Sequence, residues 1–303
     1  MSEDFKQKLI RHAIRIGSDL NLVQGPGGNI SMKLDGIIQV KASGMQLSEA
    51  GIQNIFVPLN LTALNRDEVL NRDDFTTSVI GSVASSNQLK PSIETNLHLL
   101  MPHNCVTHIH SLGSILLGFV DIDLFRIQIA EFKHRIDRLE YTRPGKDLAK
   151  SIVGLPLSDL KILVLRNHGS IFVGDNFNEI ETMIRDFEYF ALKKIKELFM
   201  NESFPAWFEI LDAGVLTPDE AVFLGERPFS LNFDDRKTSV IVGAKGILSI
   251  PKNFNLTQIQ LVNFYINVAK MMHKRMSPNY LEYQEVQFLL NWNKEKLRMK
   301  MIK

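Results

Sequence analysis

Residues 91–110 read Pro-Ser-Ile-Glu-Thr-Asn-Leu-His-Leu-Leu-Met-Pro-His-Asn-Cys-Val-Thr-His-Ile-His, a short helical pattern that leads into an apolar strand. Side chains two apart on a strand point to the same face, so His108 and His110 would present their imidazoles side by side. A third histidine, His168, follows another apolar run in Leu-Arg-Asn-His-Gly. Three neutral imidazoles leave one position of a tetrahedral zinc ion open for water or substrate. An isolated His-x-His is more often an ordinary strand segment, but the surrounding motifs favour a metal site here.

Composition and charge are those of an ordinary globular chain. Its 303 residues suffice for one large domain or two, and 35 basic side chains nearly balance 34 acidic ones, for a formal charge of +1. This balance argues against nucleic-acid or acidic-membrane partners. The single cysteine, Cys105, excludes an internal disulfide and is interpreted as a core residue. Because residues 1–8 lack a signal-peptide pattern and no apolar run reaches membrane-spanning length, we expect a cytoplasmic protein.

Two glycine-containing turns flank a predicted hairpin near the N-terminus. The sequence first predicts a helix that is capped by Ser2 and ends near residues 17–20. It then contains Gly-Pro-Gly-Gly-Asn-Ile-Ser at 25–31, Asp-Gly at 35–36, a strand at 37–41 and Ala-Ser-Gly at 42–44. Glycines let backbone N–H groups approach an anion, so the two turns could cradle one phosphate, although each alone is more often a simple tight turn. Lys33 and Lys41, near these turns, are interpreted as solvated residues.

Strands and helices then alternate as far as residue 200. The predicted elements are a strand at 56–59, a helical turn or two at 63–70, a loop at 82–88, helices at 115–117 and 146–153, strands at 161–165 and 171–173, and an amphipathic helix at 178–200. The pattern breaks at 201–205. We therefore predict a catalytic domain at 1–204 and a C-terminal extension at 205–303.

The C-terminal extension is predicted to be mostly helical. Thr-Pro-Asp-Glu at 217–220 is typical of a helix start, with an N-cap, proline at N1 and an acidic first turn. The remaining predicted elements are hairpin strands at 238–242 and 246–250 and two helices at 257–276 and 280–299. No residue of this segment carries chemistry that the sequence alone identifies, so we interpret it as a cap or an oligomer-forming element.

The order and spacing of five motifs resemble the class II aldolase/adducin family over residues 5–200. The motifs are Gly-Gly-Asn-Ile-Ser, Lys-Ala-Ser-Gly, Pro-Ser-Ile-Glu, His-Ile-His and Asn-His-Gly. The Val-Lys-Ala-Ser-Gly form is especially similar to the aldolase part of bifunctional rhamnulose-phosphate aldolase/dehydrogenase proteins. No dinucleotide-binding glycine loop is present, so we expect no dehydrogenase half. The resemblance implies a three-layer α/β/α fold of the α/β class, with a central, mostly antiparallel sheet and assembly into a homotetramer.

The resemblance also implies roles for individual residues. His108, His110 and His168 would bind one zinc ion per chain, and Glu94 matches the catalytic carboxylate. Residues that match the positions holding the substrate phosphate are Gly28, Asn29, Ser43, Gly44 and Ser92. The family often reads Pro-Ser-Ser-Glu, and Ile93 replaces the second serine, which removes one hydroxyl from the expected phosphate site. Tyr141 matches a tyrosine that reaches into a neighbouring subunit's site as a proton donor.

These residues predict a zinc-dependent aldolase that makes or cleaves a C–C bond in a ketose phosphate. Zinc held by three neutral histidines would keep its charge and stabilise the enediolate as a Lewis acid. Glu94 would move the α-proton, and the Tyr141 phenol would protonate the departing aldehyde oxygen. The other histidines outside the triad are interpreted as structural or surface residues, with His98 the strongest exception because it lies one helical turn after Glu94.

Other functions remain open on the same scaffold. One is a sugar-phosphate epimerase or dehydratase; epimerases of this family resemble Pro-Ser-Ser-Asp at the carboxylate, so Glu94 favours an aldolase or a dehydratase. Another is a metal-free, adducin-like binding protein, which ranks low because all three histidines are present. The partner we expect is a small sugar phosphate. Its identity and stereochemistry, and the metal used in the cell, are open, because manganese, cobalt and iron suit similar ligands.

Overall fold

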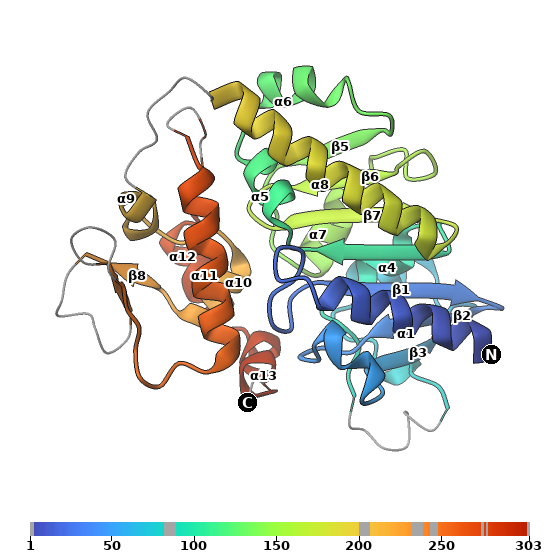
Figure 1. The fold of residues 1–303 in the computed structure, drawn as a ribbon. Helices are drawn as coiled ribbons and strands as arrows, with labels where there is room; N and C mark the ends of the chain where they lie inside the picture. The colour runs from blue at the N-terminus through green and yellow to red at the C-terminus, as the bar shows by residue number, and fades with distance from the viewer. Residues whose placement is uncertain are drawn as a thin grey trace.

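A seven-stranded sheet forms the centre of the computed structural model, which describes residues 3–81, 89–199, 207–231, 239–242, 248–273, 276 and 278–301. The strand order is β3-β2-β1-β4-β7-β6-β5 (Figure 1). The strands are β1 (Asn29–Leu34), β2 (Ile37–Lys41), β3 (Phe56–Asn60), β4 (Cys105–Ile109), β5 (Ile136–Leu139), β6 (Ile162–Leu165) and β7 (Gly169–Gly174). Among the described strands of this sheet, only β5 and β6 pair in parallel, so the predicted, mostly antiparallel sheet is confirmed.

Helices cover both faces of this sheet, which confirms the three-layer α/β/α prediction. Figure 1 shows α1 (Glu3–Gly17) and α8 (Phe177–Phe199) on the near face, and α4 (Thr95–Leu100) and α7 (Lys146–Ser151) behind the sheet. Cys105 and Phe172 belong to the core on the α1 and α8 side, whereas Val106 and Ile171 belong to the core under α4 and α7. Cys105 is fully buried, as predicted.

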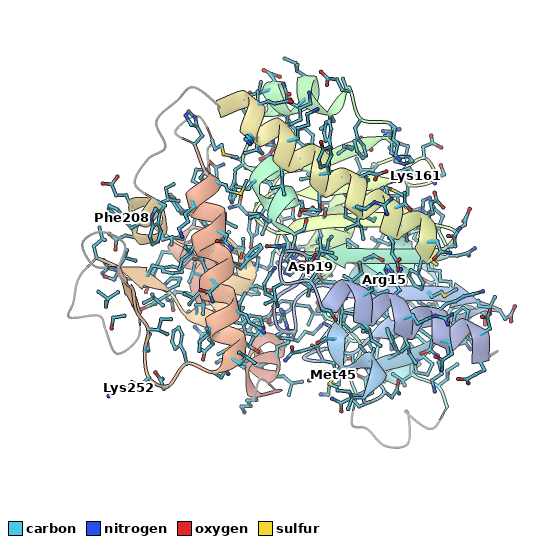
Figure 2. The ribbon with its side chains drawn as sticks, in the orientation of Figure 1. Arg15, Asp19, Met45, Lys161, Phe208 and Lys252 are labelled. Carbon is cyan, nitrogen blue, oxygen red and sulfur yellow. The ribbon has the colours of Figure 1, made fainter. Side chains whose placement is uncertain are left out.

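Local sequence explains the elements nearest the site. The predicted stripe of α1 is buried, and Figure 2 shows Arg15 on its outer side next to α8, where it pairs with Glu181. The β1–β2 hairpin turns at Asp35 and Gly36, both with positive φ, as the Asp-Gly signal predicts. The remaining helical segments of this part are 3-10 turns η1 (Leu47–Gly51) and η2 (Thr76–Ser78), and helices α2 (Arg66–Asn71), α5 (Leu112–Gly118) and α6 (Ile122–Ile129).

The C-terminal segment lies beside the sheet and shares its core. It contains α9 (Trp207–Asp212), α10 (Pro218–Leu224), β8 (Phe229–Ser230), β9 (Val240–Val242), β10 (Leu248–Ser249), α11 (Leu256–Met271), α12 (Tyr283–Asn291) and α13 (Asn293–Met301). Leu116 of α5 and Leu261 of α11 belong to one continuous apolar core. The division at residue 204 stays a prediction, and both residues 201–205 and the predicted loop 82–88 lie outside the described residues.

Two predictions about the C-terminal segment were wrong in detail. The helix predicted at 257–276 ends at Met271, and the helix predicted at 280–299 is two helices. Trp292 separates α12 from α13 with an extended backbone (ψ 122°), although no proline or glycine signals the break. The predicted hairpin is present as the antiparallel pair β9–β10, with residues 243–247 outside the described part.

The sequence interpretation also missed β5 and α6. Each carries mostly half-buried or exposed side chains, so neither shows a clear apolar period.

Within the described residues, no helix is long and apolar enough to cross a membrane.

Candidate metal centre and anion cradle

Three buried histidines converge at the carboxyl end of β4 and the turn that enters β7. His108 lies at the end of β4, His110 just beyond it, and His168 just before β7. The Nε2 atom of His108 is 3.0 Å from Nε2 of His110 and 3.3 Å from Nε2 of His168. A tetrahedral ion with Zn–N bonds of about 2.0–2.1 Å separates its nitrogen ligands by roughly 3.3 Å. Two of the three ligand pairs are therefore close to the spacing around a tetrahedral ion, and all three ligand atoms lie within 4.8 Å of one another.

Hydrogen bonds at Nδ1, on the side of the ring away from the cluster, show that His108 and His110 each carry a proton on Nδ1. The Nδ1–H of His108 donates to the carbonyl oxygen of Ser170 (3.0 Å), and the Nδ1–H of His110 donates to Asp219 Oδ2 (2.8 Å). Burial lowers the pKa of His108 to about 4 and that of His168 to about 3, so both rings are neutral at pH 7. His108 is thus neutral and protonated at Nδ1, and its Nε2 lone pair points at the Nε2 atoms of the other two rings, an arrangement that a cation between them would stabilise.

The backbone conformation of the turn that carries His168 depends on its two neighbours, Asn167 and Gly169. Asn167 has φ +58°, a region that asparagine tolerates better than most residues. Gly169 has φ +154°, and a Cβ there would lie 2.2 Å from the Ile109 carbonyl oxygen. The Asn-His-Gly sequence is therefore needed to bring the third imidazole against the first two.

Glu94 faces the same point as the three imidazole nitrogens. Its Oε1 is 3.5 Å from His168 Nε2, and its Oε2 is 3.5 Å from His108 Nε2. Burial by itself raises the pKa of Glu94, but the three imidazoles and a hydrogen bond from Asn29 lower it to about 2, so the group is a carboxylate at pH 7. Among the described residues, buried Oε1 has no hydrogen-bond partner. An orphaned carboxylate oxygen beside three converging lone pairs fits a divalent cation and its ligands.

A buried chain of hydrogen bonds orients Glu94. Asn29 Nδ2 donates to Glu94 Oε2 (2.8 Å), and Asn29 Oδ1 accepts from His98 Nε2. The other ring nitrogen of His98 bonds to the Ser31 hydroxyl at 2.7 Å, and burial lowers the pKa of His98 to about 3, so the ring is neutral. His98 thus acts on Glu94 through Asn29. Asn29, a predicted phosphate ligand, uses one N–H and its Oδ1 in these two contacts and lines the cavity.

The predicted phosphate-binding turns lie next to each other beside this cluster. Ala42 pairs with Pro91 in an isolated bridge, and the backbone N–H of Ser43 donates to the Lys90 carbonyl oxygen (2.8 Å). The Ser92 hydroxyl accepts from the backbone N–H of Glu94 (3.2 Å). One cavity is lined by Gly28, Asn29, Ser43, Gly44, Ser92, Glu94, His110 and His168, so these predicted residues meet in one place. Their roles stay predictions.

Lys41 is not solvated, contrary to the sequence interpretation. Its ammonium group is buried at the end of β2, where it donates to the carbonyl oxygens of Pro26 (2.7 Å) and Gly28 (2.8 Å). Burial lowers the pKa of Lys41 to about 7. Because the side chain crosses to the glycine turn, Lys41 holds that turn in place and lines the cavity. Lys33 is half-buried and contacts the Met101 carbonyl oxygen, so it too is not fully solvated.

Asp219 and Arg298, from the C-terminal segment, are site residues that the sequence interpretation missed. Asp219 bonds to His110, and its Oδ1 accepts from Arg298 Nη2 (3.0 Å). Burial raises the pKa of Asp219, but Arg298 and His110 outweigh this effect and lower it, so the carboxyl is ionised. The only sequence signal was an acidic residue in a helix first turn, which that position explains by itself.

Tyr141 lies outside the cavity of its own chain. Its hydroxyl donates to Glu285 Oε1 (2.9 Å), and the same carboxylate accepts from Arg143. Burial raises the pKa of Tyr141, so the phenol stays protonated. The role of Tyr141 as a proton donor in a neighbouring subunit, and the tetramer on which it depends, stay predictions.

Comparison with known proteins identifies the class. The family described as "Class II Aldolase and Adducin N-terminal domain" matches residues 7–192, more than half of the chain, so the chain belongs to the class II aldolase/adducin family. This confirms the resemblance inferred from the five motifs. The match ends before the C-terminal segment.

Relatives with names and structures are similar at the level of the family. A Bacillus subtilis protein named uncharacterized oxidoreductase YuxG is 26% identical over 259 residues, which cover 76% of this chain and 36% of that protein. This chain thus spans about a third of that relative. An L-fuculose phosphate aldolase from Methanococcus vannielii is 25% identical over 169 residues, covering 53% of this chain and 80% of the relative.

Two solved structures share the fold. The N-terminal class II aldolase domain of a conserved protein from Thermoplasma acidophilum has a TM-score of 0.54 at 24% identity, covering 64% of this chain and 95% of that chain. A sugar-phosphate aldolase from Thermotoga maritima has a TM-score of 0.53 at 14% identity, covering 66% and 97%. At these identities the likeness shows the fold alone.

Proposed function

We propose that this chain is a zinc-dependent aldehyde-lyase that makes or cleaves a C–C bond in a ketose phosphate. The observation that carries the proposal is the convergence of the three Nε2 atoms beside the orphaned Oε1 of Glu94. Membership of the family supports it, as does the similarity to a protein named L-fuculose phosphate aldolase. We further propose a small sugar phosphate as the partner, with the homotetramer and cytoplasmic location as predictions.

Separate residues of this chain would bind the metal and transfer the proton. A divalent ion held by His108, His110 and His168 would supply Lewis-acid stabilisation of negative charge on the substrate's carbonyl and hydroxyl oxygens. In condensation Glu94, ionised and fixed by Asn29, would take the α-proton. In cleavage Glu94 would first receive the proton that the substrate's reacting hydroxyl loses and would then give a proton to carbon. Burial of all these groups excludes water, which strengthens each electrostatic interaction in the site.

The charges around the cavity favour an anionic substrate once a divalent ion is bound. Three carboxylates, Glu94, Asp219 and Glu295, lie in one buried cluster with two cations, Lys41 and Arg298. With every group ionised their sum is −1, and a divalent ion changes it to +1. A phosphate on the substrate would then be attracted to the cavity. The hydroxyls of Ser43 and Ser92 on the cavity wall would supply hydrogen-bond donors.

Substrate binding requires side chains on the cavity wall to move. The cavity has a volume of about 20 Å³, whereas one water occupies roughly 10–15 Å³ on this measure. A second cavity of about 160 Å³ shares Ser43 and Ile93 with it, and Leu297 of α13 lines its other side. Residues of α13 contribute to the walls of both cavities, Arg298 to the first and Leu297 to the second.

Cleavage of phosphorylated ketoses tests the proposal. Full-length protein supplied with zinc is expected to release dihydroxyacetone phosphate from at least one of a panel of ketose 1-phosphates that includes L-fuculose and L-rhamnulose 1-phosphates. A coupled assay for dihydroxyacetone phosphate follows the rate, and carbon NMR identifies every product. Epimerised or dehydrated sugar without cleavage would replace the aldolase by the alternative reactions. No conversion of any sugar phosphate by zinc-loaded protein would contradict the proposal.

Ser43→Ala tests the phosphate cradle. The variant loses a hydroxyl at the cavity wall, and a hydrogen bond to a charged group contributes about 1.5–3 kcal/mol, so KM should rise roughly 10- to 100-fold. We expect kcat to change little, since Ser43 does not contact Glu94 or the histidines. Steady-state kinetics measure both parameters, with Ser158→Ala, an exposed serine, as the control. An unchanged KM would remove Ser43 from the phosphate site.

A further inference from the structure

The C-terminal segment contacts the three histidines at two places. Asp219 of α10 accepts the Nδ1–H of His110 at 2.8 Å. In the turn that carries His168, the Nδ2 of Asn167 lies 2.7 Å from the Leu216 carbonyl oxygen and within 2.9 Å of two more carbonyl oxygens of the same segment, those of Pro278 and Asn279. The segment is therefore attached to the His110 and His168 positions, whereas His108 takes its Nδ1 partner from the sheet.

Asp219 is itself held rigidly. The side chain of Thr217 caps the first turn of α10 by accepting from the backbone N–H of Glu220, and Pro218 occupies the first turn. Arg298 of α13 donates to Asp219 Oδ1 at 3.0 Å and to both carboxylate oxygens of Glu295 at 2.9 Å. All of these side chains are buried, so little water competes for the contacts.

The loop opposite leaves space for the His110–Asp219 pair. A Cβ at Gly27 would lie 2.6 Å from Asp219 Oδ2 and 3.0 Å from His110 Nδ1, closer than real Cβ contacts come. Any residue larger than glycine would push the carboxylate and the imidazole apart. The glycine-dense turn of the family part and the C-terminal segment thus fit each other around this hydrogen bond.

A carboxylate that accepts the far N–H of a ligating histidine sets its tautomer and orientation and makes the other nitrogen a better ligand. We propose that Asp219 is a positioning residue for His110, that Arg298 positions Asp219, and that the C-terminal segment thereby completes the metal centre. The inference rests on the proposed function, because it takes the three histidines as metal ligands. It goes beyond that function by making part of the chain outside the family match necessary for full metal affinity.

Zinc affinity of full-length Asp219→Asn tests the proposal. The apo-protein is titrated with zinc against a chromophoric chelator, and we expect an affinity roughly 10- to 100-fold below that of the wild type. The matched control is Lys294→Met, which removes a contact of α13 with the Asp73 carbonyl oxygen without touching a histidine or Asp219. The zinc dissociation constant of the control should lie within about twofold of the wild-type value.

A second variant keeps the test decisive if Asp219→Asn fails to fold. Gly27→Ala removes no buried charge but should separate Asp219 from His110, and we expect a several-fold weaker zinc affinity. Wild-type affinity in a folded Asp219→Asn or in Gly27→Ala, or an equal loss in Lys294→Met, would overturn the inference alone. Absence of zinc binding by the wild type would overturn the proposed function together with it.

Discussion

Replacing His168 by alanine is expected to weaken zinc binding by roughly 100-fold or more and to abolish lyase activity. Structural zinc sites bind with about 10–16 kcal/mol over four ligands, so one ligand accounts for roughly 3 kcal/mol. The remaining nitrogens of His108 and His110, 3.0 Å apart, cannot surround the ion. Chelator competition measures the affinity, and the coupled assay measures the rate before and after zinc is added in excess.

His134→Ala provides the matched control for that loss. His134 is partly exposed, contacts Phe132 and lies outside the triad. The control should keep the affinity and rate of the wild type. Wild-type zinc affinity in His168→Ala would show that His168 is not a ligand, and the three-histidine centre would have to be abandoned.

Glu94→Gln should lower kcat by roughly 10²- to 10⁴-fold while the metal stays bound, since proton transfer by a positioned side chain contributes about that factor. Glutamine keeps the size of the side chain and an oxygen that can accept from Asn29, but it cannot take a proton from carbon. Exchange of the α-proton of dihydroxyacetone phosphate in heavy water, followed by proton NMR, reports proton transfer separately from C–C bond formation. That exchange should be lost together with cleavage.

The two readouts separate a catalytic from a structural role for Glu94. A variant that loses zinc as well as activity would make Glu94 a metal ligand first. A variant that exchanges the α-proton at the wild-type rate would show that another group is the base. Ser158→Ala, at an exposed serine outside the cavity, is the control, and α-proton exchange should persist in it.

The family part of the site was predictable because its residues act within short, recognisable stretches. His108 and His110 follow from strand alternation, and Glu94, Ser43 and His168 from the motifs that contain them. The order of these motifs is enough to indicate the layered fold, whose antiparallel sheet the structure confirms. Site residues can be predicted from sequence where a short stretch sets both the backbone geometry and the side-chain chemistry.

The rest of the site depends on contacts between residues far apart in the chain. Asp219 pairs with a histidine 109 positions earlier, and Arg298 reaches back 79 positions to Asp219. The carboxylate of Asp219 already has a sufficient local explanation at a helix start, and α13 follows a break at Trp292 that no glycine or proline signals. Lys41 likewise looks in sequence like a solvated residue at a strand end, because its contact with the Pro26 carbonyl oxygen of the glycine turn exists only in the folded chain.

The metal content of the purified 303-residue protein tests whether His108, His110 and His168 hold a divalent ion. Elemental analysis is made on protein supplied with zinc and then freed of loosely bound metal by gel filtration. We expect about one divalent ion per chain, lost on treatment with a strong chelator and restored by zinc. Protein that retains no divalent metal after exposure to zinc, manganese or cobalt would contradict the account, and the adducin-like binding scaffold would become the leading interpretation.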